Sequence, residues 1–226
     1  MPTIDQIIRS RRKTIALIIT REGKLVVRAP LRASRAQIDA LVAEKSVWIQ
    51  AHQAAMLARP QAPAHRFIAG ESFAYLGQAY PLRITSDGKR GLELRAGQFV
   101  LAAQAAGNAR GAFVSWYRRQ ARAVLAERVA RHAARLGYHP GPLRISSARS
   151  RWGSCSHSGT LSFTWRLVLA PLEVIDYVVV HELVHLKVKN HSRDFWQAVA
   201  MAYPGYTAAR KWLKENNELG AEFLDL

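Results

Sequence analysis

The chain has 226 residues, of which 49% are hydrophobic, so it can bury a core as one large domain or two small ones. No stretch approaches the roughly 20 apolar residues of a membrane-spanning helix, and the basic N-terminus lacks the apolar segment of a secretory signal. The single cysteine, Cys155, excludes disulfides within the chain. We therefore expect a cytoplasmic protein with no membrane contact. The formal net charge of +17 indicates either a surface for nucleic acid or an acidic substrate, or a diffusely basic protein.

The first half of the chain predicts short strands and one helix. Residues 14–19 and 24–28 are apolar segments on either side of the turn signal Arg21-Glu22-Gly23, which predicts a β-hairpin. Ser34 is a typical N-cap, and apolar residues recur at helical spacing behind it to about residue 56. After a break at residues 59–63, four strands are expected at residues 73–76, 80–84, 92–94 and 99–102, with turns at Gly77 and residues 87–88.

The second half predicts one long helix and then a mixture of strands and helices. The long helix covers residues 109–136, behind Gly107-Asn108 and before Gly137. Arginines of this helix stand at positions 118, 119, 122, 128, 131 and 135, and part of this set follows one stripe, because 118 and 122, and then 128, 131 and 135, are spaced by three or four residues. The remaining elements are strands at 143–147 and 160–165 around a loop at 149–155, and helices at 171–189, 193–202 and 207–217.

The most informative segment is His181-Glu182-Leu183-Val184-His185, followed by His191. Two histidines four apart on a helix lie almost one above the other, so both imidazoles can bind one metal ion. Glu182 projects to the side, where it can take a proton from a metal-bound water without binding the metal itself. His191 offers a third nitrogen, and three protein ligands leave the fourth tetrahedral position to water, as in catalytic zinc sites. The alternative of two solvated histidines is disfavoured by the apolar run at residues 174–180.

For His191 to reach the metal, the helix must end between His185 and His191. Extended-loop zinc proteases of the metzincin type use this three-histidine spacing with a glycine at the bend. Here that position is Val188, which we expect to stay helical, so Asn190 is the predicted left-handed residue. Ser192 is the predicted N-cap of the next helix.

Several residues near the site admit two interpretations. Met201 is either a core residue or a methionine turn beneath the metal. Cys155 is either a small buried hydrophobe, or a fourth ligand or redox switch. Asp176 and Asp194 either orient a ligand imidazole or serve in capping their helices.

The predicted fold class is α+β. Residues 106–226 are expected to form a zincin-like catalytic domain, with an active-site helix and a small mixed sheet, and residues 1–105 a small β-rich part with one helix. In zincins an edge strand beside the metal helix pairs with an extended peptide substrate. The segment 159–165 is either that edge strand or an ordinary inner strand of the hairpin.

Five motifs follow one another in order: Arg151-Trp152-Gly153-Ser154-Cys155-Ser156, Trp165-Arg166-Leu167, residues 176–183, Asn190-His191-Ser192 and Phe195-Trp196. Together with Ala29-Pro30-Leu31 and Trp48-Ile49 they resemble the YgjP-like metallopeptidases, over nearly the whole chain. That family looks related to SprT/Spartan-type and WLM-type proteases. The resemblance implies a Zn²⁺ ion held by His181, His185 and His191, with Glu182 as the base. One departure is Thr164, where the family usually has asparagine.

We therefore expect a zinc-dependent hydrolase, and in the first place a metallopeptidase acting on a peptide or protein substrate. Glu182 would take a proton from the zinc-bound water and later pass it to the leaving amine. The developing oxyanion needs a stabilising group. The candidates for this or another substrate contact are Arg151, Arg166, Tyr203 and Tyr206. Residues of these types more often have a structural role, which is the alternative interpretation of each.

Three other functions remain open at the level of the sequence. Some relatives in the resembled family are described as hydrolysing nucleoside triphosphates, UTP in particular, and a basic surface would suit such a pyrophosphatase. The chain has, however, no Gly-rich phosphate loop and no carboxylate cluster for magnesium. A DNA-associated protease would bind nucleic acid through the same basic surface. A structural zinc in a basic interaction module would leave Glu182 without a role.

Overall fold

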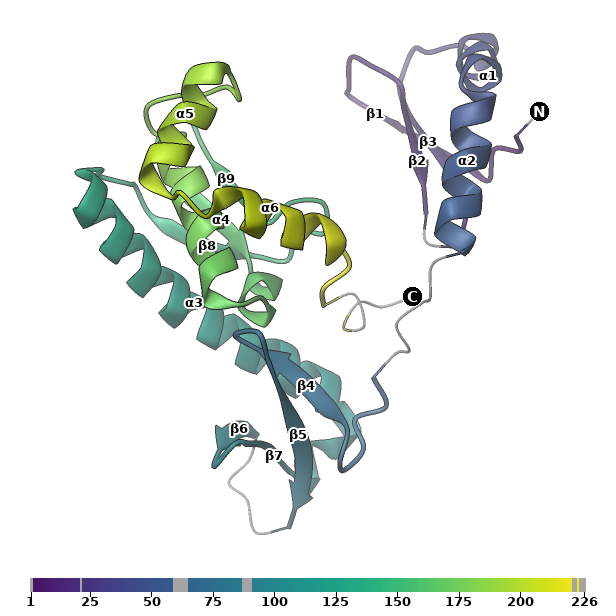
Figure 1. The fold of residues 1–226 in the computed structure, drawn as a ribbon. Coiled ribbons are helices and arrows are strands. Elements are labelled where there is room, and N and C mark those ends of the chain that lie inside the picture. The colour runs from purple at the N-terminus through teal and green to yellow at the C-terminus, as the bar shows by residue number, and fades with distance from the viewer. Residues whose placement is uncertain (1, 21, 59–64, 87–90, 221–222, 224–226) are drawn as a thin grey trace. The chain divides into compact units, whose positions relative to one another are not determined.

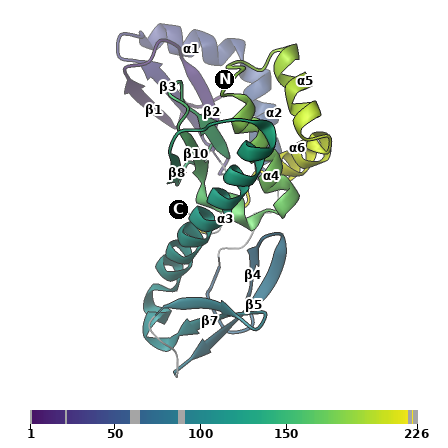
Figure 2. The ribbon, with the colours of Figure 1, turned by 90° about the vertical axis from the view of Figure 1, so that its left-hand side faces the viewer.

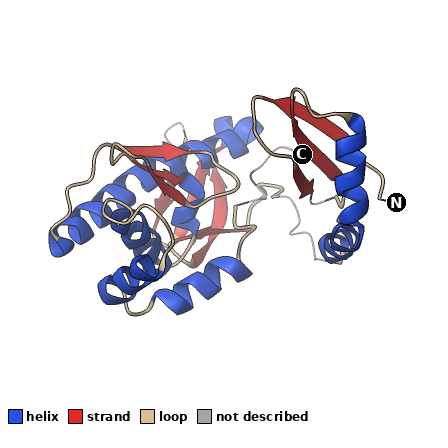
Figure 3. Ribbon diagram, turned by 90° about the horizontal axis from the view of Figure 1, so that it is seen from above, coloured by secondary structure: helices blue, strands red, loops and turns tan. Residues whose placement is uncertain are grey.

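The computed structural model describes residues 2–20, 22–58, 65–86, 91–220 and 223. Contacts divide the chain into two compact units, residues 1–62 and 63–226. In the part of the chain so described, none of the helices combines the length and apolar character that crossing a bilayer requires. Helices, short strands and small mixed sheets occur together (Figure 3), so the predicted α+β class is confirmed.

The first unit is a three-stranded sheet with two helices (Figure 1). Its elements are β1 (Gln6–Ser10), β2 (Ala16–Ile19), β3 (Leu25–Pro30), α1 (Arg35–Glu44) and α2 (Ser46–Leu57). The predicted hairpin is confirmed as the antiparallel pair of β2 and β3, whereas β1, which pairs parallel with β3, was not predicted. The core of this unit consists of Leu25, Val27, Ala29, Ile38, Val42 and Ile49.

The single helix predicted over residues 34–56 is wrong, because the chain leaves helical geometry at Lys45 (φ −94°, ψ 13°). The start is confirmed, since the Ser34 hydroxyl caps Gln37 in a capping box. One straight helix of that length would extend about 34 Å. The six residues of β3 span only about 20 Å, so the break keeps both helices against the short sheet.

The second unit begins with a four-stranded sheet of order β4-β5-β7-β6. Its strands are β4 (Ser72–Tyr75), β5 (Gln78–Thr85), β6 (Leu92–Arg95) and β7 (Gln98–Ala102), which confirms the four predicted strands. The predicted break at 59–63 and the predicted turn at 87–88 both lie outside the described residues.

This sheet packs against α3 (Ala109–Leu136) and the short 3-10 helix η2 (Trp165–Leu169). The Tyr117 hydroxyl on α3 donates to the Ala74 carbonyl at 2.7 Å, and the backbone N–H of Leu76 donates to the Val168 carbonyl at 2.8 Å. One buried aromatic core therefore includes residues on both sides of position 105, among them Phe73, Phe99, Phe113, Tyr117 and Trp165. These contacts place residues 63–105 in the same compact unit as α3. The expected division into two domains, residues 1–105 and 106–226, stays a prediction.

A long central helix links the two sheets of the second unit. Helix α3 has the predicted bounds, begins behind the capping side chain of Asn108 and ends at Gly137, whose φ of 65° suits a glycine. It runs from the β4–β7 sheet to the second sheet (Figure 2). The remaining elements are η1 (Ala103–Asn108), β8 (Leu143–Ser146), β9 (Gly153–Cys155), β10 (Leu161–Thr164), α4 (Leu172–Val184), α5 (Arg193–Ala202) and α6 (Tyr206–Glu215).

The second sheet has the order β8-β10-β9, and this order decides which strand borders the metal helix. β10 is parallel to β8 and antiparallel to β9, so it is the inner strand and the segment 159–165 is not the edge. The edge beside α4 is β9, which was predicted as a loop. Glycine, serine and cysteine carry no strand signal, so only the pairing of β9 with β10 makes it a strand.

Candidate active site

Helix α4 positions the first two histidines. Pro171 precedes it, Glu173 lies in its first turn, and every residue from Val174 to Val180 is buried. The helix packs against α3, α5, α6 and β9, which together enclose it. Its continuous apolar run is therefore explained by burial on several sides, and only its C-terminal end presents polar side chains to the site.

The helix ends earlier than predicted, at Val184, with His185 as its C-cap. Tight turn hydrogen bonds follow, and the Nδ1 atom of His185 donates to the carbonyl of Val188 at 2.9 Å. Val188 lies beyond these turns and is not helical. Asn190 is not left-handed either, and both predictions about this bend are wrong. The predicted N-cap Ser192 is confirmed, because its hydroxyl accepts from the N–H of Phe195.

The three predicted ligands meet at one point. His191 Nε2 lies 3.1 Å from His181 Nε2, and one nitrogen from each of His181, His185 and His191 falls within 4.8 Å of the others. Two nitrogens bound tetrahedrally at 2.0–2.1 Å from a zinc ion would be about 3.3 Å apart. The buried ring of Phe195 packs against all three imidazoles, with centroid distances of 4.4–4.9 Å. The cluster has the spacing and the shared wall of a metal site.

The surroundings of His181 and His185 favour the neutral form of imidazole, which is the form that binds metal ions. The pKa of His181 is lowered to about 3, chiefly by burial and to a smaller extent by the neighbouring positive charges of His185, His191 and Arg210. Burial also lowers the pKa of His185. Because His185 Nδ1 must donate to a carbonyl, its Nε2 is the nitrogen left with a lone pair for a metal.

Glu182 lies beside the histidines with only 5% of its surface exposed. Burial raises the pKa of its carboxyl group to about 7, although the positive charge of Arg151 opposes this shift. A Cβ atom on Gly153 would fall 2.6 Å from Glu182 Oε1. Gly153 therefore allows β9 to approach the carboxylate closely, a role that the sequence did not reveal.

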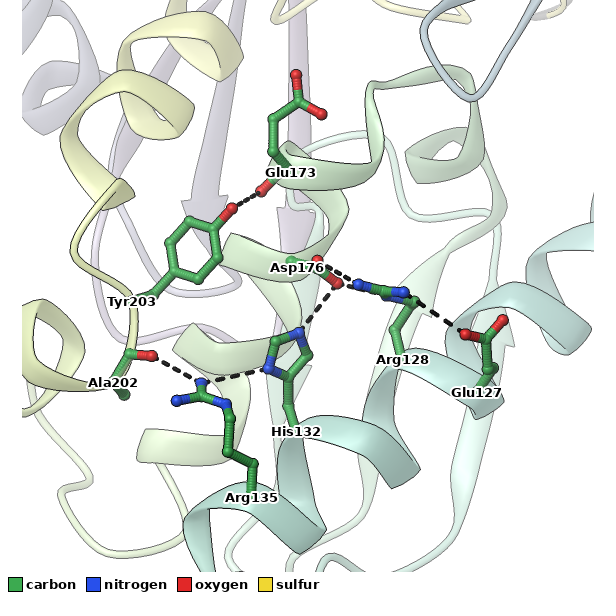
Figure 4. Close-up of polar contacts among 8 residues, drawn as sticks. All are labelled: Glu127, Arg128, His132, Arg135, Glu173, Asp176, Ala202 and Tyr203. Atoms are coloured by element: carbon green, nitrogen blue, oxygen red, sulfur yellow. Dashed lines mark hydrogen bonds and ion pairs between the residues drawn. The ribbon is translucent and has the colours of Figure 1, made fainter.

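Asp176 does not support a ligand imidazole, contrary to one of the two predicted roles. Its carboxylate accepts a hydrogen bond from Arg128 Nε at 2.6 Å, pairs with the same guanidinium through a second nitrogen, and lies 3.0 Å from His132 Nε2 (Figure 4). Burial by itself would raise the pKa of Asp176, but the hydrogen bonds from His132 and Arg128 outweigh it and lower the pKa. The network fastens α4 to α3. His181 Nδ1 has no hydrogen-bond partner among the described residues.

Two of the four predicted substrate contacts are engaged elsewhere. Arg166 is 4% exposed and donates to the carbonyl of Ala148, which ties η2 to the loop before β9. The Tyr203 hydroxyl donates to the carbonyl of Glu173 at 2.8 Å, near the start of α4 (Figure 4). Both side chains serve to hold elements around the site.

The other two candidates lie at the site. Arg151 is exposed and close enough to Glu182 to affect its pKa. Tyr206 stacks on Trp196 at 5.9 Å, and Trp196 in turn stacks on His191. The sequence reasoning missed Arg210, whose guanidinium lies 4.6 Å over the Trp196 ring. Tyr206 and Arg210 lie four apart on one helix, a spacing that could have indicated a shared face.

Cys155 and Met201 have no role as ligands in the structure. Cys155 lies outside the metal-binding group found among the described residues, and burial raises the pKa of its thiol. Cys155 is only partly buried, and its role as a small hydrophobe or a redox switch stays a prediction. Met201 is 84% exposed on α5, so both the core and the methionine-turn interpretations are wrong.

The arginine stripe on α3 is partly occupied by contacts within the protein. Arg118 donates to the Ser147 hydroxyl at 2.8 Å, Arg128 binds Asp176, and Arg135 donates to the Ala202 carbonyl at 2.7 Å. These side chains join α3 to its neighbours, so the spacing of arginines does not by itself define a free basic surface. Contact with nucleic acid or a nucleotide stays a prediction.

Three clustered imidazoles beside a buried carboxylate, carried by an α+β fold, define a protein of the metal-dependent hydrolase class. The family model for the YgjP-like metallopeptidase domain matches residues 13–216, and the chain belongs to this family. The family implies a metal ion, and the histidine cluster could hold it. The resemblance noted in the sequence is confirmed.

Among solved structures, the crystal structure of the metallopeptidase zymogen abylysin from Pyrococcus abyssi is similar to this chain. The similarity covers 41% of this chain and 94% of the other, with 23% sequence identity and a TM-score of 0.37. No curated protein gives a significant match.

Proposed function

We propose that the protein is a zinc-dependent peptidase in which Glu182 is the general base. The observation that carries the proposal is the meeting of His181, His185 and His191 within 4.8 Å, directly beside the buried carboxylate. Three imidazole nitrogens without an oxygen-rich shell suit zinc, and they exclude the oxygen coordination that magnesium and calcium prefer.

Each residue has a defined task in peptide hydrolysis. A bound zinc ion supplies Lewis acidity, which makes water a nucleophile near neutral pH and polarises the substrate carbonyl. A Glu182 carboxylate oxygen takes the proton from the attacking water and then delivers it to the nitrogen of the leaving amine. The close approach of Gly153 restricts the glutamate side chain, which supports a fixed orientation for both transfers.

The edge of β9 supports a peptide as the substrate. The N–H of Thr164 donates to the carbonyl of Trp152, and the N–H of Ser156 donates to the carbonyl of Thr160, so even-numbered residues of this strand face β10. Because antiparallel strands alternate, the N–H and C=O groups of Gly153 and Cys155 point away from the sheet. An extended peptide could pair with these groups directly beside Glu182.

A cationic group beside the cluster supports the stabilisation of an oxyanion. Arg210 is held over Trp196, which stacks on His191 and lies 5.9 Å from His181. Tyr206 stacks on the same indole and belongs to the same helix as Arg210. We assign the role of oxyanion stabiliser to Arg210, with Tyr206 as a second donor.

The proposal predicts zinc-dependent cleavage of peptides. The zinc-loaded protein, incubated with a mixture of unstructured peptides, should produce new termini detectable by mass spectrometry. Cleavage should stop when a chelator removes the metal and return when zinc is restored. If the protein instead releases phosphate or pyrophosphate from UTP and cleaves no peptide, the peptidase function is wrong and the nucleotide alternative is right.

A further inference from the structure

A cavity of about 270 Å³ opens where strand β9 begins. Arg149, Arg151 and Arg166 line it, together with Trp152 and Thr164. The volume corresponds to about nine water molecules at their share of liquid volume, which is enough for one amino-acid side chain and some solvent. None of the described residues that line the cavity is acidic.

The three arginines differ in burial and in hydrogen bonding. Arg166 is buried and its guanidinium donates to the Ala148 carbonyl, which fixes the backbone immediately before Arg149. Arg149 and Arg151 are exposed and make no hydrogen bond or ion pair within the part of the chain that the structure describes. Arg149 and Arg151 lie together at the mouth of a cavity whose described lining contains no acidic residue, and the carboxylate on which the charge of Arg151 acts is that of Glu182. The two guanidinium groups create a positive potential at the cavity that favours an anion.

A buried hydroxyl gives a second and independent indication of a ligand. Thr164 is 1% exposed, and its Oγ1 atom has no hydrogen-bond partner among the described residues. Buried polar atoms are nearly always paired, because an unmade hydrogen bond costs free energy. A hydroxyl that lines a basic cavity can donate to an anionic oxygen, which would satisfy it.

The cavity lies next to the edge of β9 that is proposed to pair with a peptide. Arg151 lies two residues before Gly153, the residue that contacts Glu182. At the rise of a β-strand, two residues correspond to about 7 Å. A peptide paired with β9 would therefore bring a side chain two or three residues from its cleaved bond to the mouth of the cavity.

We propose that this cavity is a substrate subsite that binds a carboxylate of the peptide, so that the enzyme prefers an acidic residue two or three positions from the cleaved bond. Arg149 and Arg151 would pair with the carboxylate oxygens, and the Thr164 hydroxyl would donate to one of them. The indole of Trp152 would cover the methylene groups of the side chain. The inference rests on the proposed peptidase function.

A series of matched peptides tests the preference. A neutral peptide that the zinc-loaded protein cleaves is resynthesised with one glutamate, or one glutamine, at each position around the cleaved bond. One glutamate position should raise kcat/KM at least about tenfold over its glutamine match, the size expected for a charge-assisted pair. The same peptides with an amidated C-terminus distinguish the two possible carboxylates. Amidation abolishes a preference for the C-terminal carboxylate and leaves a preference for the glutamate side chain unchanged.

Two variants locate the preference in the cavity. Arg149→Gln and Thr164→Val should each reduce the ratio of glutamate to glutamine kcat/KM severalfold while cleavage of the neutral peptide continues. The control is Arg131→Gln, which removes an exposed arginine of α3 and should leave the ratio unchanged. A ratio near one in the wild type, or an unchanged ratio in both cavity variants, overturns the subsite.

A binding measurement separates this inference from the proposed function. Fluorescence anisotropy with labelled peptides is measured on the zinc-loaded Glu182→Gln variant, which should bind without turnover. Tighter binding of the glutamate peptide supports the subsite even if no peptide is cleaved, a result that would overturn only the peptidase function. If the glutamate and glutamine peptides bind equally tightly, and inorganic phosphate displaces neither of them, the carboxylate subsite is overturned. Binding of phosphate or UTP without binding of the acidic peptide overturns it also.

Discussion

Replacing Glu182 with glutamine should lower kcat for peptide hydrolysis by about 10²–10⁴-fold, the usual contribution of a general base. Glutamine has nearly the same size, so it can keep the packing against Gly153, but its amide cannot accept a proton from water. The three histidines are untouched, and bound zinc should stay at the wild-type level. Steady-state kinetics with one peptide and metal analysis of the same sample check both statements. A fully active variant would show that Glu182 is not the base.

The substitution Gly153→Ala tests the position of the same carboxylate, because Gly153 lies on strand β9 next to Glu182. The added methyl group would lie 2.6 Å from Glu182 Oε1, so the glutamate must move from its position. We expect reduced kcat with retained zinc. Ser154→Ala is the matched control, because it changes the neighbouring residue of β9 on its other face and should remain active.

Replacing Asp176 with alanine should destabilise the protein by about 3–5 kcal/mol, the usual cost of removing one partner from a buried ion pair. Arg128 and His132 would lose their common acceptor between α3 and α4. Urea unfolding measures the loss of free energy. The control is Glu127→Ala, which removes an exposed carboxylate 3.5 Å from the same guanidinium and should cost less than about 1 kcal/mol. Equal effects of the two variants would contradict the structural role of Asp176.

The same network predicts a pH dependence. Because the folded state lowers the pKa of Asp176 below its unfolded value of about 3.9, its carboxylate stabilises the fold above that pH and loses this effect as pH falls through the lower, folded pKa. The difference in unfolding free energy between wild type and Asp176→Ala should shrink as the pH falls below about pH 4. A chelator in both samples prevents protons from acting through a bound metal. A difference independent of pH down to pH 2 would contradict this explanation.

The features of the site that depend on residues close together in the sequence could be predicted from the sequence. The spacing of His181 and His185 on one helix, the cap at Ser192 and the bounds of α3 depend on neighbouring residues, and the structure agrees with each of them. The predicted end of α4 is wrong: the apolar periodicity continues past Val184, whereas the helix ends there and His185 Nδ1 contacts the Val188 carbonyl.

The residues around the ligands depend on contacts between distant segments. Gly153 matters because β9 pairs with β10 and thereby lies against Glu182. Arg210 reaches the histidines only because α6 packs on α4. One predicted role of Asp176 was to orient a ligand imidazole, but its carboxylate instead contacts an arginine and a histidine of α3. Each of these is a tertiary relation, and a single sequence carries no direct signal for it.

The central claim, a zinc ion held by three histidines, is tested most directly by the metal content of the purified protein after loading with zinc and desalting. Wild type should retain about one zinc per chain, and His185→Ala should lose it. His52→Ala, which removes an exposed histidine of the first unit, should retain zinc like the wild type. A wild-type protein that retains no zinc, or a His185→Ala variant that retains it fully, would contradict the account.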